Sequence, residues 1–457
     1  MFEFEQASPV LKHYKWSKIM KKILIYGLFC LVAGISTVTV TATASAAVTA
    51  ETAFIYNTLS FLVHGFLVMW MAAGFCMLEA GLVRSKNTAM QCSKNIGLYS
   101  IAGIMYWLIG YNLMYTGVDA GYMGTPSPWS AADPSITADG FKADDSNVYS
   151  AGSDWFFQMV FVAAAGSIVS GTVAERVKVF SFLVFIVILT GVIYPIQGSW
   201  TWGGGWLSEM GFSDFAGSTI VHSVGGWAAL TGALIIGARK GKYTEDGQVN
   251  PMPGANLPLA TLGTFILWLG WFGFNGGSQL AMGTAADVRD ISSIYINTNL
   301  AAAGGVVAAI ILTQILYKKL DLTMALNGAL GGLVAITAEP LAPTPGLSIL
   351  VGGVGGIIVV LAIPLLDKLK IDDVVGAIPV HLLAGIWGTI AVVLSNGDAS
   401  LGTQLIGIIS IGIFVVVTSA IVWFVLKLTL GLRPTEEEEM DGLDKSECGM
   451  EAYPEFR

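Results

Sequence analysis

The chain has 457 residues, of which 54% are hydrophobic and only 12% are charged, and its formal net charge is −9. Soluble globular domains carry about 25% charged residues, so this composition excludes an ordinary soluble enzyme, a disordered chain and a coiled coil. An acidic chain without a basic stripe also lacks the features of a nucleic-acid-binding protein. The composition indicates an integral membrane protein with a lipid bilayer as its solvent.

The first 46 residues have the pattern of a secretory signal peptide. Lys21 and Lys22 precede a short apolar run, and a stretch of small residues then ends in A-S-A at Ala46. A basic region, a short apolar region and an A-x-A site are the three parts of such a signal, and the alternative is an uncleaved first span. We therefore expect a signal peptide (1–46), a transmembrane domain (47–430) and an acidic cytoplasmic tail (431–457).

Eleven further runs are long and apolar enough to cross about 30 Å of hydrocarbon, which takes about 20 helical residues. Membrane β-strands would be shorter and would alternate in hydrophobicity, so we predict an all-α membrane protein with eleven transmembrane helices. The predicted spans are centred near Trp70, Met105, Gly166, Ile186, Ala228, Ile266, Val307, Leu330, Gly356, Ile386 and Phe414.

Basic residues collect in the connections that follow the odd-numbered spans. These residues are Arg84, Lys86, Lys94, Arg176, Lys178, Arg239, Lys240, Lys242, Lys318, Lys319, Lys368 and Lys370. The even-numbered exits hold only Lys142 and Arg289. The positive-inside rule then predicts a cell (inner or plasma) membrane protein with the mature N-terminus outside, the C-terminus in the cytoplasm, and an outside loop from Asp119 to Asp154.

Two predicted spans each contain a histidine in matching surroundings. His222 lies in DFAGSTIVHSVGG and His381 in DVVGAIPVHLLAG, so both have Asp at −8, Gly at −5, Val at −1 and Gly at +4. These are the fifth and tenth spans. Because five is odd, two five-helix halves run in opposite directions, which predicts an inverted repeat plus one extra helix.

The paired histidines favour a transport pathway over catalysis. An ionisable side chain at membrane depth usually faces a polar pathway or partner, although a packed core histidine is the alternative, and imidazole can pass a proton. Neither a third His, a Cys pair nor HExxH accompanies them, so we expect no metal site. A phosphate loop and a nucleophile elbow are also absent, so we expect a protein that is not an enzyme and has no cofactor.

Aromatic residues near the predicted outer face form a second candidate site. Trp202 opens WGGGW, Phe161 lies in the third span, and WFGFNGGS ends the sixth span. Ring faces attract small cations, so these rings and a serine hydroxyl can hold a monovalent cation. Packing in an aromatic belt is the alternative for each ring.

Several long motifs resemble those of the ammonium transporter (Amt/MEP/Rh) family, on its Amt branch. The similarity runs from about Phe54 to Phe456, and its motifs are VAERVKV, HSVGGWAALTGALIIG, FGFNGGS, NTNLAAAGG, AIPVHLLAGIWGTIAV and LRPTEEEEMDGLD. The resemblance implies a homotrimer with one conduction path in each subunit. The substrate would be ammonium or ammonia, and the sequence leaves open whether methylammonium is carried.

The resemblance also implies roles for individual residues. Trp202, Ser278 and Phe161 would bind ammonium at the outer mouth, and Phe161 would stack with Phe274 as the gate. His222 and His381 would share a hydrogen bond and line the pore as a proton relay. Asp214 would support ammonium binding, a role that can coexist with a helix-capping role for Asp214 and Asp373, and Trp271 would line the pore. His64 matches none of these motifs and is expected to pack in the core.

The acidic tail leaves two interpretations open. The run Glu436–Glu439 is typical of solvated chain, whereas the resemblance implies a regulatory segment that contacts a neighbouring subunit and a PII-type signalling protein. Two alternative functions also remain: a cation or water pore, and an ammonium sensor or regulatory transceptor built on the same fold.

Overall fold

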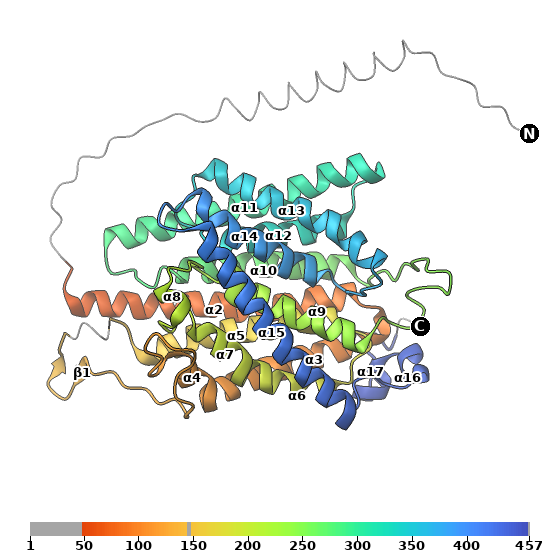
Figure 1. Ribbon diagram of the computed structural model, residues 1–457, viewed down its shortest axis with the longest axis horizontal. Helices are drawn as coiled ribbons and strands as arrows, with labels where there is room; N and C mark the ends of the chain where they lie inside the picture. The colour runs from red at the N-terminus through yellow and green to blue at the C-terminus, as the bar shows by residue number, and fades with distance from the viewer. Residues whose placement is uncertain (1–47, 144–147, 456–457) are drawn as a thin grey trace, which may run out of the picture. The chain divides into compact units, whose positions relative to one another are not determined.

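The computed structural model describes residues 48–143 and 148–455, and these residues are mostly helical with a single short strand pair (Figure 1). The predicted signal peptide, residues 1–46, lies outside the described residues. The described chain from Val48 onward forms one unit that includes the acidic tail.

The first half contains the following elements: α2 (Ala50–Leu82), η1 (Ser85–Asn87), α3 (Thr88–Met105), η2 (Tyr106–Gly110), α4 (Tyr111–Tyr115), β1 (Ile136–Thr137), β2 (Gly140–Phe141), α5 (Ala151–Thr172), α6 (Val179–Ile188), η3 (Leu189–Ile193), α7 (Tyr194–Ser199), α8 (Trp206–Glu209), η4 (Ser218–Ser223) and α9 (Val224–Ile236). The second half contains α10 (Leu257–Gly277), α11 (Ala285–Tyr317), α12 (Leu322–Thr337), α13 (Pro345–Lys368), η5 (Ile378–Leu383), α14 (Ala384–Ala391), η6 (Val392–Leu394), α15 (Leu401–Thr429), α16 (Glu436–Asp441) and α17 (Leu443–Cys448).

Nine helical segments of the described chain are long and apolar enough to cross a membrane. Two shorter apolar helices, Leu322–Thr337 and Ile378–Leu394, lie where the eighth and tenth spans are predicted. A helix of 16 residues is only about 24 Å long at 1.5 Å per residue. Length alone therefore supports nine of the eleven predicted spans, and the full count remains a prediction.

The predicted outside loop differs from the observed segment in one respect. Strands β1 and β2 form a short antiparallel hairpin within it, with Ile136 opposite Phe141. Helix α5 already begins at Ala151, so Asp154 is a helical residue rather than the last residue of the loop.

Glycine-rich helix faces allow close packing. Helices α11, α12 and α13 contact one another, and α2 packs along α10 (Figure 1). A Cβ added at Gly352 of α13 would collide with the backbone of Ala301 in α11. Small residues are what let membrane helices approach to this distance.

Both histidine-bearing segments begin in the same way. Asp214 accepts hydrogen bonds from four backbone N–H groups, those of Gly217 to Ile220, at 2.8–3.0 Å. Asp373 accepts them from Gly376 and Ile378 at 3.2 and 2.7 Å. These carboxylates satisfy N–H groups that have no partner within the helix, so both aspartates are caps.

The glycines of the matching motifs also have matching backbone conformations. Gly217 has φ 108° and Gly376 has φ 82°, a region that residues with a Cβ rarely adopt. Each is followed by a π-helical turn, η4 or η5, that contains the histidine. Single π-helical turns are rare and frequently occur at functional sites.

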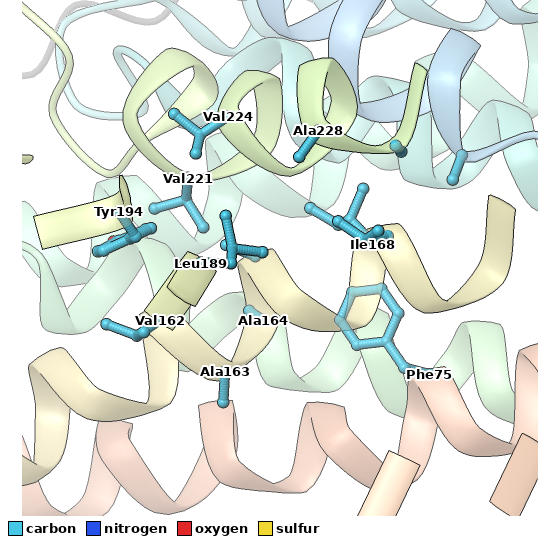
Figure 2. Close-up of a cluster of buried hydrophobic side chains, with 14 of the residues drawn as sticks. Phe75, Val162, Ala163, Ala164, Ile168, Leu189, Tyr194, Val221, Val224 and Ala228 are labelled. Carbon is cyan, nitrogen blue, oxygen red and sulfur yellow. The ribbon is translucent and has the colours of Figure 1, made fainter. Parts of the chain in front are cut away.

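Gly226 and Gly385, each four residues after its histidine, lie where the two histidine-bearing segments cross. A Cβ at Gly226 would lie 2.7 Å from the Cβ of Leu382, and one at Gly385 would lie 2.5 Å from Oγ of Ser223. The histidine segments therefore approach more closely than larger residues would allow. Figure 2 shows the apolar core beside this crossing, where Val221 and Val224 lie among side chains of α5 and η3.

The acidic tail packs against the helical bundle. Asp444 accepts hydrogen bonds from the N–H groups of Ala89 and Met90 at 3.0 and 2.8 Å, at the start of α3. Glu439 is 1% exposed and pairs with Arg433 at 2.5 Å. The interpretation of Glu436–Glu439 as only solvated chain is therefore wrong for Glu439, because its carboxylate is buried and has a cationic partner.

Candidate functional site

A cavity of about 380 Å³ opens at one end of the bundle, which we call the Trp202 end. Its lining includes Trp202, Phe161 and Ser278, three of the predicted binding residues. The Trp202 and Phe161 rings meet edge to face with centroids 6.1 Å apart. The structure thus brings together an aromatic wall and a hydroxyl that the sequence places on three separate segments.

Phe161, which lines this cavity, stacks on a second phenylalanine, Phe274. The Phe161 and Phe274 ring centroids are 4.1 Å apart, and both side chains are buried. The Ser278 hydroxyl lies one helical turn beyond Phe274 and donates to its carbonyl at 2.8 Å. The two rings therefore connect the cavity, which Phe161 lines, to His222, on which Phe274 stacks.

Beneath the phenylalanines lie the two histidines. The His222 ring stacks on Phe274 with centroids 5.0 Å apart, and its Nδ1 lies 3.2 Å from Nδ1 of His381. The expected hydrogen bond between the histidines is therefore present, with one Nδ1 donating and the other accepting. Nε2 of His222 is buried and has no hydrogen-bond partner among the described residues.

Trp271 packs against the histidines from the side. Its ring stacks on His222 with centroids 5.0 Å apart, and its Nε1 donates to Thr337 Oγ1 at 2.8 Å. The indole N–H is thereby occupied and the ring face is presented to the imidazole. This geometry fits a residue that lines the passage.

Asp214 does not reach the cavity at the Trp202 end. It is absent from the cavity lining within residues 148–455, and both carboxylate oxygens are used by the backbone amides described above. Burial raises its pKa, and those amides oppose the shift. The backbone carbonyl of Asp214 accepts a hydrogen bond from Trp202 Nε1 at 3.0 Å, so Asp214 can influence the site by positioning Trp202.

Sequence reasoning missed a different carboxylate. Asp154 lines the cavity together with Gln158, and it accepts a hydrogen bond from the hydroxyl of Tyr111. No motif marks Asp154, but its position seven residues before Phe161 on one helix, two turns away, places both on one face. From that spacing, the sequence could have predicted that Asp154 lies on the same side of the helix as Phe161.

A second cavity, of about 230 Å³, opens at the opposite end, which we call the Arg239 end. Its lining includes Arg239, Asp373 and Asn327. A smaller cavity of about 10 Å³ lies between it and His381, and it shares Asn327 and Val375 with the larger one. The histidine pair therefore lies between two cavities that open at opposite ends of the bundle.

Buried ion pairs strengthen the Arg239 end. Arg239 makes a bidentate contact with Asp372, with both N···O distances 2.9 Å, and Glu175 lies 3.4 Å from its guanidinium. Burial opposes ionisation of Asp372, but the hydrogen bonds and charge of Arg239 hold its pKa below 3.8. Burial lowers the pKa of Arg176 to about 10. These pairs fix the connections that carry the predicted basic residues.

The other predictions concern residues away from the passage. His64 bonds to the Ser60 carbonyl at 2.9 Å and to the Tyr295 hydroxyl at 3.0 Å, which agrees with a packing role. Within the described ranges, no group of three or more His, Cys, Asp or Glu residues is arranged to hold a metal ion.

The family model of the Ammonium Transporter Family matches residues 59–453. The chain belongs to the ammonium transporter family. Ammonium transporter Amt2 of Archaeoglobus fulgidus is 42% identical to it over 425 residues, which cover 86% of this chain and 87% of the relative. The resemblance seen in the sequence motifs is thereby confirmed.

Solved structures of family members share the fold. A protein described as a sensor Amt protein is 35% identical, with a TM-score of 0.80, and the match covers 87% of this chain and all of that one. Mep2 of Candida albicans is 25% identical with a TM-score of 0.73, covering 85% of this chain and 88% of the other. The family and the apolar helices identify an integral membrane protein, and the curated relatives are named as ammonium transporters.

Proposed function

We propose that this chain transports ammonium by recruiting NH₄⁺ at the aromatic cavity, removing a proton and conducting NH₃ past the two histidines. The observation that carries the proposal is the continuous stack of Phe161, Phe274, His222 and His381 between two cavities. Trp202, Phe161 and Ser278 hold the cation at the mouth, where ring faces contribute about 0.5–2 kcal/mol by cation–π attraction.

The stack supports selection by deprotonation. NH₄⁺ and K⁺ are similar in size, so a rigid cage separates them poorly. Moving a full charge into an apolar passage costs many kcal/mol, whereas a neutral amine crosses at much lower cost. Phe161 and Phe274 form an apolar gate, so only a cation that can release a proton passes it. The proton then travels separately along His222 and His381, which makes transport electrogenic.

The Trp202 end is the outer end in this proposal. Arg84, Arg176 and Arg239, which follow odd-numbered predicted spans, are connected by ion pairs or hydrogen bonds at the opposite end. By the positive-inside rule that end faces the cytoplasm, and the tail that packs beside it is cytoplasmic as well. The cell membrane, the outside N-terminus and the cleavable signal peptide belong to the same proposal.

The wider assembly follows from family membership. We propose eleven spans in two inverted five-helix repeats plus one, with the matching caps of Asp214 and Asp373 as support, and a homotrimer in which each subunit has its own pore. The tail would contact a neighbouring subunit and a PII-type signalling protein. A second candidate function, an ammonium sensor or transceptor, is favoured by the likeness to the protein described as a sensor Amt.

Purified protein in liposomes tests the proposal. We expect ammonium pulses to produce a current that K⁺ pulses do not, and His222→Ala or His381→Ala to abolish or strongly reduce it. Unchanged ammonium-specific current in both variants would remove the histidines from the mechanism. A chain that binds ammonium but carries neither current nor ammonia would be a sensor.

A further inference from the structure

Helix α2 contains a buried carboxylate that the proposed pathway does not use. Glu79 is 1% exposed. Its Oε2 accepts hydrogen bonds from Gln91, from Asn95 at 2.9 Å and from the Ser170 hydroxyl at 2.7 Å. Its Oε1 is equally buried but has no hydrogen-bond partner among the described residues. One oxygen is therefore saturated and the other is free.

A buried ammonium group balances the charge of this carboxylate. Lys94 is 0% exposed, and its Nζ donates to the Ser170 carbonyl at 2.8 Å. Ser170 thus connects the two groups, donating its hydroxyl to Glu79 and accepting from Lys94. Three donors on one oxygen and a nearby cation favour the ionised form of a carboxylate and oppose the effect of its burial.

The free oxygen lies at the small cavity next to His381. Glu79 and His381 both line that cavity, and a Cβ added at Gly171, on its wall, would lie 3.6 Å from Oε1. Phe75, one turn before Glu79, points toward Ile168 of α5 (Figure 2). The cavity volume of about 10 Å³ is close to the least space that one water molecule needs, and NH₃ is of similar size.

We propose that Glu79 is the proton acceptor on the exit side of the histidine pair. The proton leaves the His381 imidazolium as its N–H bond breaks, and an O–H bond forms on Oε1, directly or through one water. When NH₃ reaches the same cavity, that O–H bond breaks and a fourth N–H bond forms. NH₄⁺ then leaves toward the Arg239 end, and Glu79 is again a carboxylate. This inference rests on the proposed function.

The substitution Glu79→Gln removes the acceptor with little change in volume. In liposomes we expect the ammonium current to fall about 100-fold or more, because a positioned proton-transfer group typically contributes about 10²- to 10⁴-fold. Ammonia entry, followed as uptake of isotopically labelled ammonium, should stay within about twofold because the passage keeps its shape. Glu79→Asp, which keeps a carboxylate, should recover part of the current. A merely structural role would not separate current from ammonia entry.

Glu339→Gln is the matched control. Glu339 is also buried, accepts hydrogen bonds from Ala342 N–H and Asn396, and is outside the lining of the three cavities described above. We expect it to keep the wild-type current. Since Glu79→Gln leaves the Lys94 ammonium without its counter-charge, the double variant Glu79→Gln/Lys94→Met provides the same test with both charges removed.

The outcomes separate this inference from the proposed function. Wild-type current in a folded Glu79→Gln or double variant would overturn the role of Glu79 and leave the proposed function intact. Equal loss of current and ammonia entry would also overturn it, as would failure of both variants to fold, because Glu79 would then be structural. Absence of ammonium current in the wild-type chain would refute the proposed function, and this inference with it.

Discussion

Replacing Asp214 with asparagine distinguishes a capping role from direct cation attraction. The carboxylate accepts four backbone N–H groups at 2.8–3.0 Å, and its carbonyl holds the Trp202 indole. Asparagine has a single acceptor oxygen, and its NH₂ group would point at two of the four donors. The variant therefore loses charge and leaves buried N–H groups without an acceptor.

The cost follows from these contacts. Loss of a single N-cap costs about 0.5–2 kcal/mol, and leaving a buried donor unsatisfied costs about 1–3 kcal/mol. We expect Asp214→Asn to lower the free energy of unfolding by about 3 kcal/mol. Asp373→Asn is the matched comparison, with about half that effect, because Asp373 accepts two backbone N–H bonds and one from the Thr172 hydroxyl.

The assay combines thermal unfolding in detergent with ammonium currents at several concentrations. The capping role predicts a lower melting temperature and a lower maximal current, because η4 and its histidine lose their fixed start, with a small change in the half-saturating ammonium concentration. A variant with wild-type stability and a half-saturating concentration raised tenfold would refute the reasoning. That result would make Asp214 a cation attractor instead.

Three further predictions concern packing and charge. Gly226→Ala should destabilise the fold by about 1–3 kcal/mol through overpacking and reduce current, whereas Gly353→Ala, whose added Cβ meets atoms only at 3.8 Å or more, should be neutral in thermal unfolding. Because the folded-state pKa of Asp372 lies below 3.8, its contribution to the free energy of unfolding is present above about pH 4 and is lost as the pH falls further. Asp372→Asn should therefore flatten the acid side of the profile of unfolding free energy against pH. Asp444→Asn should release the tail to limited proteolysis, while Asp441→Asn, at an exposed position, should not.

Much of the candidate site could be predicted from local sequence patterns. Hydrophobic runs locate membrane helices because the bilayer core imposes length and apolarity on each segment separately. The repeated Asp, Gly, Val and Gly around His222 and His381 marks the histidines because capping and a left-handed glycine are local requirements. Family motifs then supplied Trp202 and Ser278.

The tertiary structure decided which of these residues share a surface. The rotation of each helix about its axis, set by contacts such as Gly226 against Leu382, determines which side chains face the passage, and the hydropathy of a single span does not encode that rotation. Glu79 therefore escaped notice, since a carboxylate in a span has the same sequence signature whether it faces a cavity or a buried lysine. Asp214 shows both cases, because its capping role follows from local sequence whereas its absence from the lining of the mouth cavity emerges only in the folded structure.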